Sequence, residues 1–145
     1  MFLVVRFNMK IVGFNFTKIY VEKFPEKGDE IKASTNINII DITPFKSDVF
    51  KSKDEILEVT FSYNLNYTPN FAKIEFKGRV LVSIEPKLSK EIIKTWDKKE
   101  TPEEFKLVVF NTILRKANLK ALDIEEELGL PLHIPLPTIQ SKKKE

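Results

Sequence analysis

The stretch that decides the fold is residues 59–67, VTFSYNLNY, in which apolar and polar residues alternate without interruption. Odd-numbered positions carry large aliphatic or aromatic side chains, and even-numbered positions carry Thr, Ser or Asn. Because successive side chains of a strand point to opposite faces of a sheet, this period of two predicts a strand with one dry face and one uncharged polar face. The polar face has no side chain that readily does acid, base or nucleophilic chemistry.

The alternation continues on both sides of this stretch and predicts a long hairpin. One strand is expected over residues 57–67 and the next over residues 71–84, with a turn between them at Pro69. Gly78, inside the second strand, marks a bulge or the close approach of another backbone. The outer face of the second strand carries the charged residues Lys73, Glu75, Lys77 and Arg79. A hairpin with one dry face requires another element to cover that face.

Two further strands are expected before the hairpin. Residues 11–22 alternate with a change of phase near residues 17–18, which indicates a bulge. Residues 31–42 form the next predicted strand, and its alternation changes phase after Ile39. A turn that contains Pro and Gly separates these two strands, and residues 44–54 are predicted as a loop.

The second half of the chain carries helical signals. A short helix capped by Ser89 is expected to end at Trp96. A long helix is expected to begin at Thr101 as its N-cap, with proline in the first turn and Glu104 closing a capping box, and to end at Gly129. Apolar residues repeat along it at intervals of three and four, as they do on one face of a helix. The repeat consists of Leu107, Phe110, Leu114, Ala117, Ala121, Ile124 and Leu128, and is widened by Phe105, Val109 and Ile113.

Strands followed by helices predict an α+β fold, with a four-stranded antiparallel sheet and a long helical hairpin or helix packed on one face. The helix would become a hairpin if it broke near Asn118, since residues 123–126 offer a second cap. The 145 residues fit a single domain, which we expect over residues 1–137, followed by a disordered basic tail over residues 138–145. The proline-rich residues 130–137 are expected to lie extended on the body of the domain.

Composition narrows the class of protein. The chain has no Cys, which excludes disulfides, thiolate metal ligands and cysteine nucleophiles. Its 24 basic and 21 acidic side chains nearly balance, which is typical of a solvated surface rather than a nucleic-acid footprint. No apolar run approaches the roughly 18 residues of a membrane span, and the first residues lack a signal-peptide pattern. We expect a cytoplasmic protein without membrane insertion that starts at Met1 or Met9, with a Lys- and Glu-rich composition resembling that of thermophile proteins.

Motifs for catalysis and metal binding are missing from the sequence. His133 is the single histidine and stands between Leu132 and Ile134 without Cys or Asp nearby, so we expect a loop side chain rather than a base or ligand. The acidic run at residues 125–127 is expected on a solvated helix face rather than around a cation. The four glycines lie too far apart to form a phosphate-binding loop. We therefore expect no enzyme activity, no cofactor and no bound metal.

Apolar residues are in surplus outside the regular elements. They occupy predicted turns, phase changes and loops, where apolar groups either cover the rim of the core or line an exposed groove or interface. These residues are Phe24, Ile40, Ile42, Phe45, Phe50 and the leucines of the proline-rich segment.

The order of these elements resembles SecB, the protein-export chaperone, and its wider SecB-like family. Residues 14–20, FNFTKIY, resemble the first strand of the family, and residues 57–84 resemble its long central hairpin. Residues 110–115, FNTILR, lie where the main helix of the family begins, and residues 130–135, LPLHIP, resemble the proline-bracketed segment that follows it. The resemblance covers most of residues 11–137 as an ordered set of patterns with few identities.

The resemblance implies ATP-independent holding of unfolded polypeptides in apolar grooves by a homo-oligomer arranged as a dimer of dimers. It implies a role in protein export or in toxin–antitoxin control. The SecB of bacterial export offers acidic residues on its sheet to the SecA motor, whereas the outward positions Lys73, Lys77 and Arg79 are basic, which disfavours docking to SecA. Together with the apolar surplus, the resemblance points to eight residues as contacts for a bound polypeptide. They are Phe24, Ile40, Ile42, Phe45, Phe110, Leu114, Leu132 and Ile134.

Two other functions stay open from the sequence. Lys73, Lys77 and Arg79 would give a nucleic-acid-binding protein a stripe for phosphate contacts, although Glu75 interrupts the stripe and the aromatic residues fall on the opposite face. Alternatively, the apolar surplus is buried between the subunits of an oligomeric interaction protein that binds no client.

Overall fold

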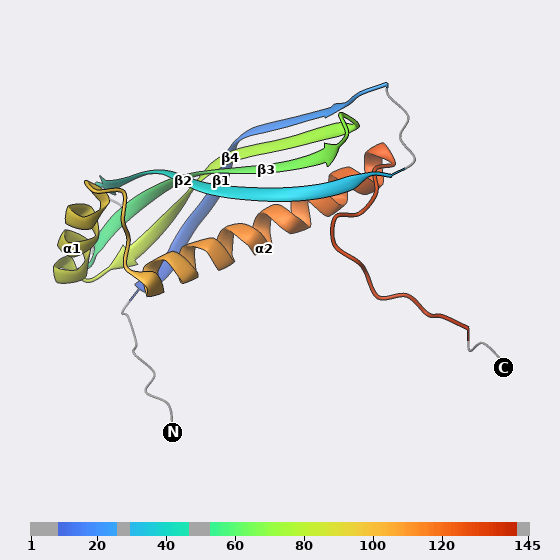
Figure 1. Cartoon of the computed structure of the whole chain (residues 1–145). Helices are drawn as coiled ribbons and strands as arrows, with labels where there is room; N and C mark the ends of the chain where they lie inside the picture. The colour runs from blue at the N-terminus through green and yellow to red at the C-terminus, as the bar shows by residue number, and fades with distance from the viewer. Residues whose placement is uncertain (1–8, 26–29, 47–52, 142–145) are drawn as a thin grey trace.

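The computed structural model describes residues 9–25, 30–46 and 53–141 and has four strands followed by two helices (Figure 1). The strands pair antiparallel in the order β1-β4-β3-β2, so β1 and β2 form the two edges of one sheet. The elements are β1 (Met9–Lys23), β2 (Lys32–Phe45), β3 (Glu55–Thr68), β4 (Ala72–Ile84), α1 (Pro86–Trp96) and α2 (Glu103–Leu128). The predicted α+β fold with a four-stranded antiparallel sheet and a long helix on one face is confirmed.

The central hairpin of β3 and β4 provides the apolar floor of the molecule. On both strands every second residue is buried, as the alternation predicts. Phe61 of β3 lies opposite Gly78 of β4, and a Cβ atom at Gly78 would stand 2.7 Å from the Phe61 ring and 2.5 Å from the backbone oxygen of Asn15 in β1. The predicted close approach at Gly78 is therefore confirmed, because a larger residue would have to displace a neighbouring backbone.

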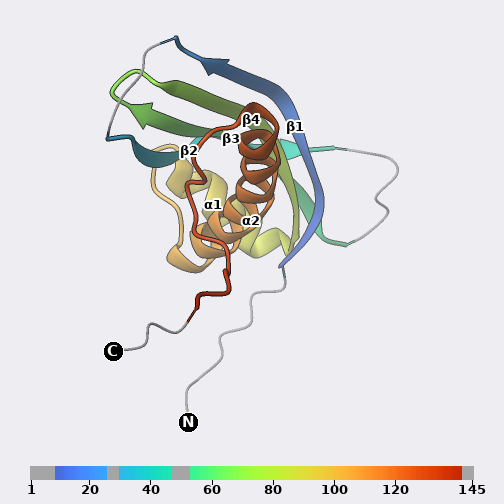
Figure 2. The same cartoon turned by 90° about the vertical axis from the view of Figure 1, so that its right-hand side faces the viewer.

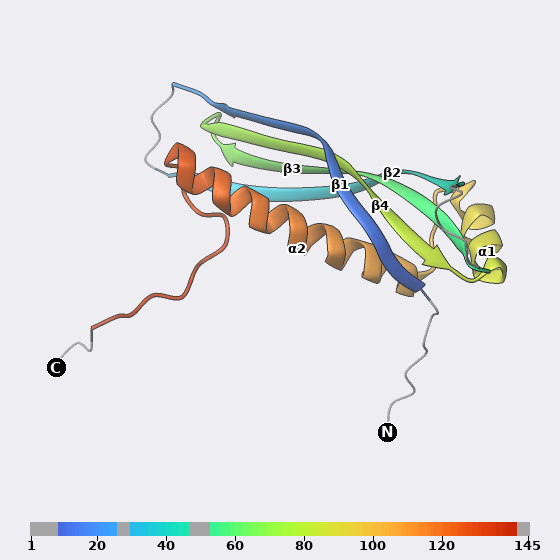
Figure 3. The same ribbon diagram turned by 180° about the vertical axis from the view of Figure 1, so that it is seen from behind.

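Helix α2 runs lengthwise along one face of the sheet (Figures 1 and 3). Its buried residues wind around its axis. They recur at steps of four, a spacing that turns about 40° around the axis at each step. The sheet twists, so a helix that crosses it must change the face that it presents along its length. The members of this stripe are Phe105, Val109, Ile113, Ala117, Ala121 and Glu125, with Ile124 beside the last turns. The predicted stripe through Leu107 is wrong at its N-terminal end, since the Leu107 side chain is 52% exposed.

Several predicted boundaries differ from the structure. Strand β2 continues through Pro44 to Phe45, where a loop was predicted, because an edge strand tolerates a proline. Helix α1 begins at Pro86 and buries Ser89 inside it, so Ser89 is no cap. The residue before α2 is Pro102, without a side-chain cap, and α2 runs without a break past residue 118.

Other local predictions are confirmed. Helix α2 ends at Gly129, which has the left-handed φ of 65° that glycine adopts most readily. Strand β1 shifts register between Phe16 and Lys18, at the predicted bulge. Strand β2 shifts register between Ile39 and Asp41, which leaves Ile40 as an extra residue on the edge strand.

Two apolar clusters share the space between sheet and helices. One lies under the α1 end of the sheet and includes Phe61, Phe105 and Val109. The other lies under the opposite end, where Tyr63 and Ala117 meet the segment after α2. Figure 2 views the molecule along the helix and shows α1 closing one end of the sheet while residues 130–141 leave along the side of β2. Residues 138–141 have no regular structure. Phe50, one of the apolar residues in surplus, and the last four residues lie outside the described part of the chain.

Among the described residues, no helix combines the length and the apolar character that a membrane crossing requires.

Candidate functional site

A groove of about 680 Å³ opens between the edge strand β2 and the N-terminal half of α2. Its lining combines apolar side chains from both elements with polar and charged side chains. Strand β2 supplies Ile37, Asn38, Ile39 and Ile40, α1 supplies Trp96, the connection supplies Lys99, Glu100 and Thr101, and α2 supplies Glu103, Lys106 and Phe110.

The end of α1 fixes one wall of the groove. The indole Nε1 of Trp96 donates a hydrogen bond to Oδ1 of Asp41 in β2 at 3.1 Å. Lys99 has a φ of 59°, which turns the chain sharply after α1 toward the start of α2. The helix and the edge strand are therefore tied together beside the groove, and the connection between α1 and α2 runs along its rim.

Each of the two aromatic rings in the groove lies under a lysine ammonium group. Nζ of Lys99 is 4.7 Å from the centroid of the Trp96 ring, and Nζ of Lys106 is 5.5 Å from the centroid of the Phe110 ring. Such cation–π contacts are weak at exposed sites, of order 0.5–1 kcal/mol. A ligand with apolar groups can therefore displace these lysines from the rings and take their place at low cost.

Strand β2 presents backbone as well as side chains to this site. It pairs with β3 along its full length, and no strand among the described residues pairs with its other side. An edge strand exposes unpaired N–H and C=O groups that a further extended chain can use. At the bulge, the Ile40 side chain is 45% exposed. The groove thus joins an apolar wall, a free sheet edge and an exposed aliphatic side chain.

The structure brings together two of the eight predicted contact residues, Ile40 and Phe110, although they are 70 positions apart in the sequence. Leu114 follows Phe110 by one turn of α2 and is half-buried on the same side. Ile42, by contrast, is 3% exposed and belongs to the core under the α1 end of the sheet. Ile42 therefore lies in the core rather than in the groove, and its role as a contact stays a prediction.

The other four predicted residues lie outside the groove. Phe24 follows β1, where its backbone N–H donates to the backbone oxygen of Phe71 at 2.8 Å. Phe45 pairs with Ile56 at the end of β2 and is half-buried. Leu132 and Ile134 belong to the segment after α2, the first exposed and the second half-buried.

Trp96, Ile37 and Ile39 line the groove but were absent from the predicted contacts. The alternation within residues 31–42 puts Ile37 and Ile39 on one face of a strand, but a local pattern does not distinguish an edge strand from a central one. A lone tryptophan at the end of a short amphipathic helix was a usable signal, because Trp is enriched at binding surfaces.

A buried polar cluster docks the segment after α2, at the end of the sheet away from α1. The Glu125 carboxylate accepts a hydrogen bond from the hydroxyl of Tyr67 and, at 3.0 Å, from the backbone N–H of His133. Nδ1 of His133 lies 2.9 Å from the same carboxylate, and its Nε2 lies 3.1 Å from Oδ1 of Asn118. The hydroxyl of Tyr63 donates to that Asn118 oxygen at 2.8 Å.

This cluster explains His133 without assigning it chemistry. The side chains of Glu125 and His133 are 0% and 4% exposed, and both ring nitrogens of His133 lie within hydrogen-bond distance of side-chain oxygens, so the buried polar atoms of the cluster have partners. Burial raises the pKa of the Tyr63 hydroxyl to about 12. The prediction of Glu125 on a solvated face is wrong, because the winding of α2 turns this residue inward. No group of side chains able to hold a metal ion occurs among the described residues.

The outer face of the sheet carries the proposed nucleic-acid stripe, and acidic residues neutralise most of it. Nζ of Lys73 lies 3.6 Å from Glu75, and Nζ of Lys18 lies 2.8 Å from the same carboxylate. The hydrogen bond from Lys18 lowers the pKa of Glu75, aided by the charges of nearby lysines. Arg79 is paired with Glu58 at 3.7 Å.

Comparison with solved structures finds a SecB-like chaperone, Rv1957 of Mycobacterium tuberculosis, in complex with a ChAD peptide from the Rv1956 HigA1 antitoxin. The two chains are 10% identical over 93% of each, with a TM-score of 0.49. No family model and no curated protein sequence matches this chain.

Proposed function

We propose that this protein binds unfolded or nonnative polypeptides and suppresses their aggregation without ATP, as a holdase of the SecB-like kind. The groove between β2 and α2 is the proposed binding site. The single observation that carries the proposal is that the groove combines apolar side chains with the free edge of β2. An extended, nonnative chain offers both partners of such a site, apolar side chains and unpaired backbone groups.

The proposed contacts are Ile40, Phe110 and Leu114 from the sequence prediction, together with Ile39 and Trp96 from the structure. Phe24, Phe45, Leu132 and Ile134 stay proposed as further contacts for long clients, outside the groove. The groove brings apolar side chains of β2 and α2 together beside the edge of β2, an arrangement that suits the binding of an extended chain.

We further propose that the protein assembles as a homo-oligomer. A dimer of dimers in the cytoplasm, serving protein export or toxin–antitoxin control, is the arrangement that the resemblance to SecB implies. Docking to SecA stays disfavoured, since the outer face of β4 carries Lys73, Lys77 and Arg79 beside a single acidic residue, Glu75.

A competing function is supported by apolar side chains that are exposed away from the groove. Ile19 of β1 and Leu119 of α2 are 48% and 62% exposed. Such residues fit an oligomer interface as well as a client surface. An interaction protein without client binding would bury them between subunits and leave no accessible apolar surface on the intact oligomer.

The test replaces two groove residues and compares them with two exposed apolar residues elsewhere. In an aggregation assay with a chemically unfolded client, Ile40→Asp with Phe110→Asp should weaken suppression at least about tenfold, because charges would have to be buried against apolar client groups. The matched control, Val12→Asp with Leu128→Asp, replaces two exposed apolar residues that do not line the groove and should suppress aggregation like the wild type.

Equal suppression by the groove variant and the wild type would exclude the groove as the site. If the wild type failed to suppress aggregation and bound no dye that reports exposed apolar surface, the interaction protein without clients would be the correct function. Light scattering on each variant shows whether the control pair has changed the oligomeric state.

A further inference from the structure

Helix α1 carries a row of lysines next to the groove, and this row defines a second part of the binding surface. Lys87, Lys90 and Lys94 follow one another at spacings of three and four, which places them on one side of the helix. Lys98 lies in the turn that follows, with its backbone N–H bonded to the Thr95 oxygen at 3.1 Å. We call these four residues the lysine row.

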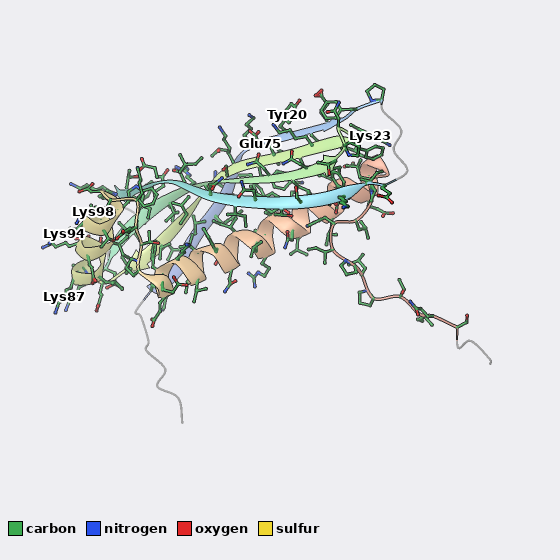
Figure 4. The ribbon with its side chains drawn as sticks, viewed as in Figure 1. Tyr20, Lys23, Glu75, Lys87, Lys94 and Lys98 are labelled. Carbon is green, nitrogen blue, oxygen red and sulfur yellow. The ribbon has the colours of Figure 1, made fainter. Side chains whose placement is uncertain are left out.

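The lysine row faces outward on a helix that is held in place from its other side. Leu88, Ser89 and Ile92 are buried against the sheet, whereas every member of the row is exposed. Figure 4 shows Lys87, Lys94 and Lys98 projecting from the same end of the molecule, away from the sheet. The row is therefore presented on a fixed element rather than on a loop.

The charges of the row are not neutralised inside the described part of the chain. No ion pair joins any of the four lysines to an acidic residue there, in contrast to Lys18, Lys73 and Arg79 on the outer face of the sheet. Glu91 and Asp97 border the row without pairing with it. A compact group of unpaired positive charges attracts a negatively charged partner and repels a basic one.

The row begins where the groove ends. Trp96 and Lys99 line the groove, and Lys98 lies between them in sequence. At a rise of 1.5 Å per residue, the row extends about 16 Å along α1. An extended polypeptide covers that length with about five residues. A chain that leaves the groove past the connection between α1 and α2 would therefore meet lysines over its next few residues.

From this arrangement we propose that the protein selects polypeptide segments in which an extended apolar stretch is followed or preceded by a cluster of acidic residues. The apolar stretch occupies the groove, and the acidic cluster lies on the lysine row. The inference rests on the proposed function, since it names the class of client that the same groove would take. A polypeptide fits better than a nucleic acid because the row adjoins apolar side chains and the edge of β2, whose backbone N–H and C=O groups can pair with an extended polypeptide but not with a nucleic acid.

The experiment measures binding of fluorescent peptides by anisotropy. Each peptide has about eight alternating apolar and serine residues, with about five Glu or about five Gln on the N-terminal or C-terminal side. The direction in which the peptide lies in the groove decides which of its ends meets the lysine row. At low salt the peptide with Glu at that end should bind about tenfold more tightly than the peptide with Gln at the same end. The difference should vanish near 1 M salt, where the screening length falls to about 3 Å, while the Gln-flanked peptides still bind.

Two triple variants assign the effect to the row. Lys87→Glu, Lys90→Glu and Lys94→Glu together should abolish the preference for the acidic flank and leave binding of the Gln-flanked peptide unchanged. The matched control reverses three exposed lysines on other elements, Lys10, Lys32 and Lys116. Both variants change the formal net charge from +3 to −3, because each replacement removes two units, so a mere net-charge effect would be equal in both. A Lys-to-Gln version of the row variant, with folding checked by circular dichroism, should give an intermediate preference.

The outcomes separate this inference from the proposed function. Equal binding of Glu- and Gln-flanked peptides to the wild type would overturn the inference and leave the groove as a client site. If no peptide bound at all, the proposed function would fail with it. If a single-stranded oligonucleotide competed as well as the acidic flank, and only the row variant lost that competition, the row would be assigned to nucleic acid and the inference would be wrong.

Discussion

At the scale of single residues, the least expected feature is the pairing of Glu125 with His133. From the sequence, Glu125 was expected on a solvated helix face and His133 in a loop. Neither expectation takes account of contacts between residues that are distant along the chain. Here one carboxylate accepts hydrogen bonds from the Tyr67 hydroxyl and from the backbone and ring of His133. The cluster holds the segment after α2 against the sheet at the end away from α1, so its role is structural.

Replacement of Glu125 by Leu should therefore destabilise the protein strongly. It would leave His133 and the Tyr67 hydroxyl buried without their acceptor, and breaking a buried pair from one side costs about 3–5 kcal/mol. The free energy of unfolding, measured in urea, should fall by about that amount. The neighbouring Glu126 is exposed, and Glu126→Leu should stay within about 0.5 kcal/mol of the wild type. Similar losses from the two variants would show that the Glu125 carboxylate does not hold the cluster together.

At the scale of elements, α2 shows how a twisted sheet changes the pattern of a helix. A stripe with the ordinary helical period stays on one face, whereas the buried residues of α2 step by four and move around the axis. The predicted stripe captured Ala117, Ala121 and Ile124 but assigned Leu107 to the core. Phe110, which the predicted stripe also assigned to the covered face of the helix, lines the groove instead.

Two truncations on α2 distinguish the winding stripe from the regular one. Ile113 is fully buried, so Ile113→Ala should lower the free energy of unfolding by about 2–5 kcal/mol through lost contacts and a cavity. Leu107 is largely exposed, and Leu107→Ala should change it by less than about 0.5 kcal/mol. Thermal and urea denaturation of both variants provide the measurement. A larger loss at Leu107 than at Ile113 would mean that α2 is rotated relative to the sheet.

At the scale of the whole molecule, local patterns predicted the architecture better than the site. The alternation at residues 59–67 correctly predicted a strand, because its period of two is that of a sheet with one covered face. Gly129 correctly predicted the end of α2, because the left-handed backbone there is a local property that glycine favours. The groove depends on facts that no local pattern contains. Strand order makes β2 an edge, and the fold brings Trp96 next to Asp41, 55 positions earlier. Burial of Ile42, two residues from the exposed Ile40, follows from a bulge that the sequence indicated only as a change of phase.

Within the described parts of the chain, the edge strands β1 and β2 each have one side without a paired strand, and β2, unlike β1, lines the groove. If a client adds to β2 as a further strand, one edge of the client backbone pairs and the other faces solvent. Two forms of the same Gln-flanked peptide, N-methylated at alternate residues in opposite phase, carry equal numbers of methyl groups on opposite edges. One form should bind at least about tenfold more weakly than the other, since its pairing N–H groups are lost. Ile40→Asp should abolish binding of both forms, which assigns the event to β2 rather than β1. Equal affinities of the two forms for the wild type would mean that side chains alone hold the client and that the edge of β2 takes no part.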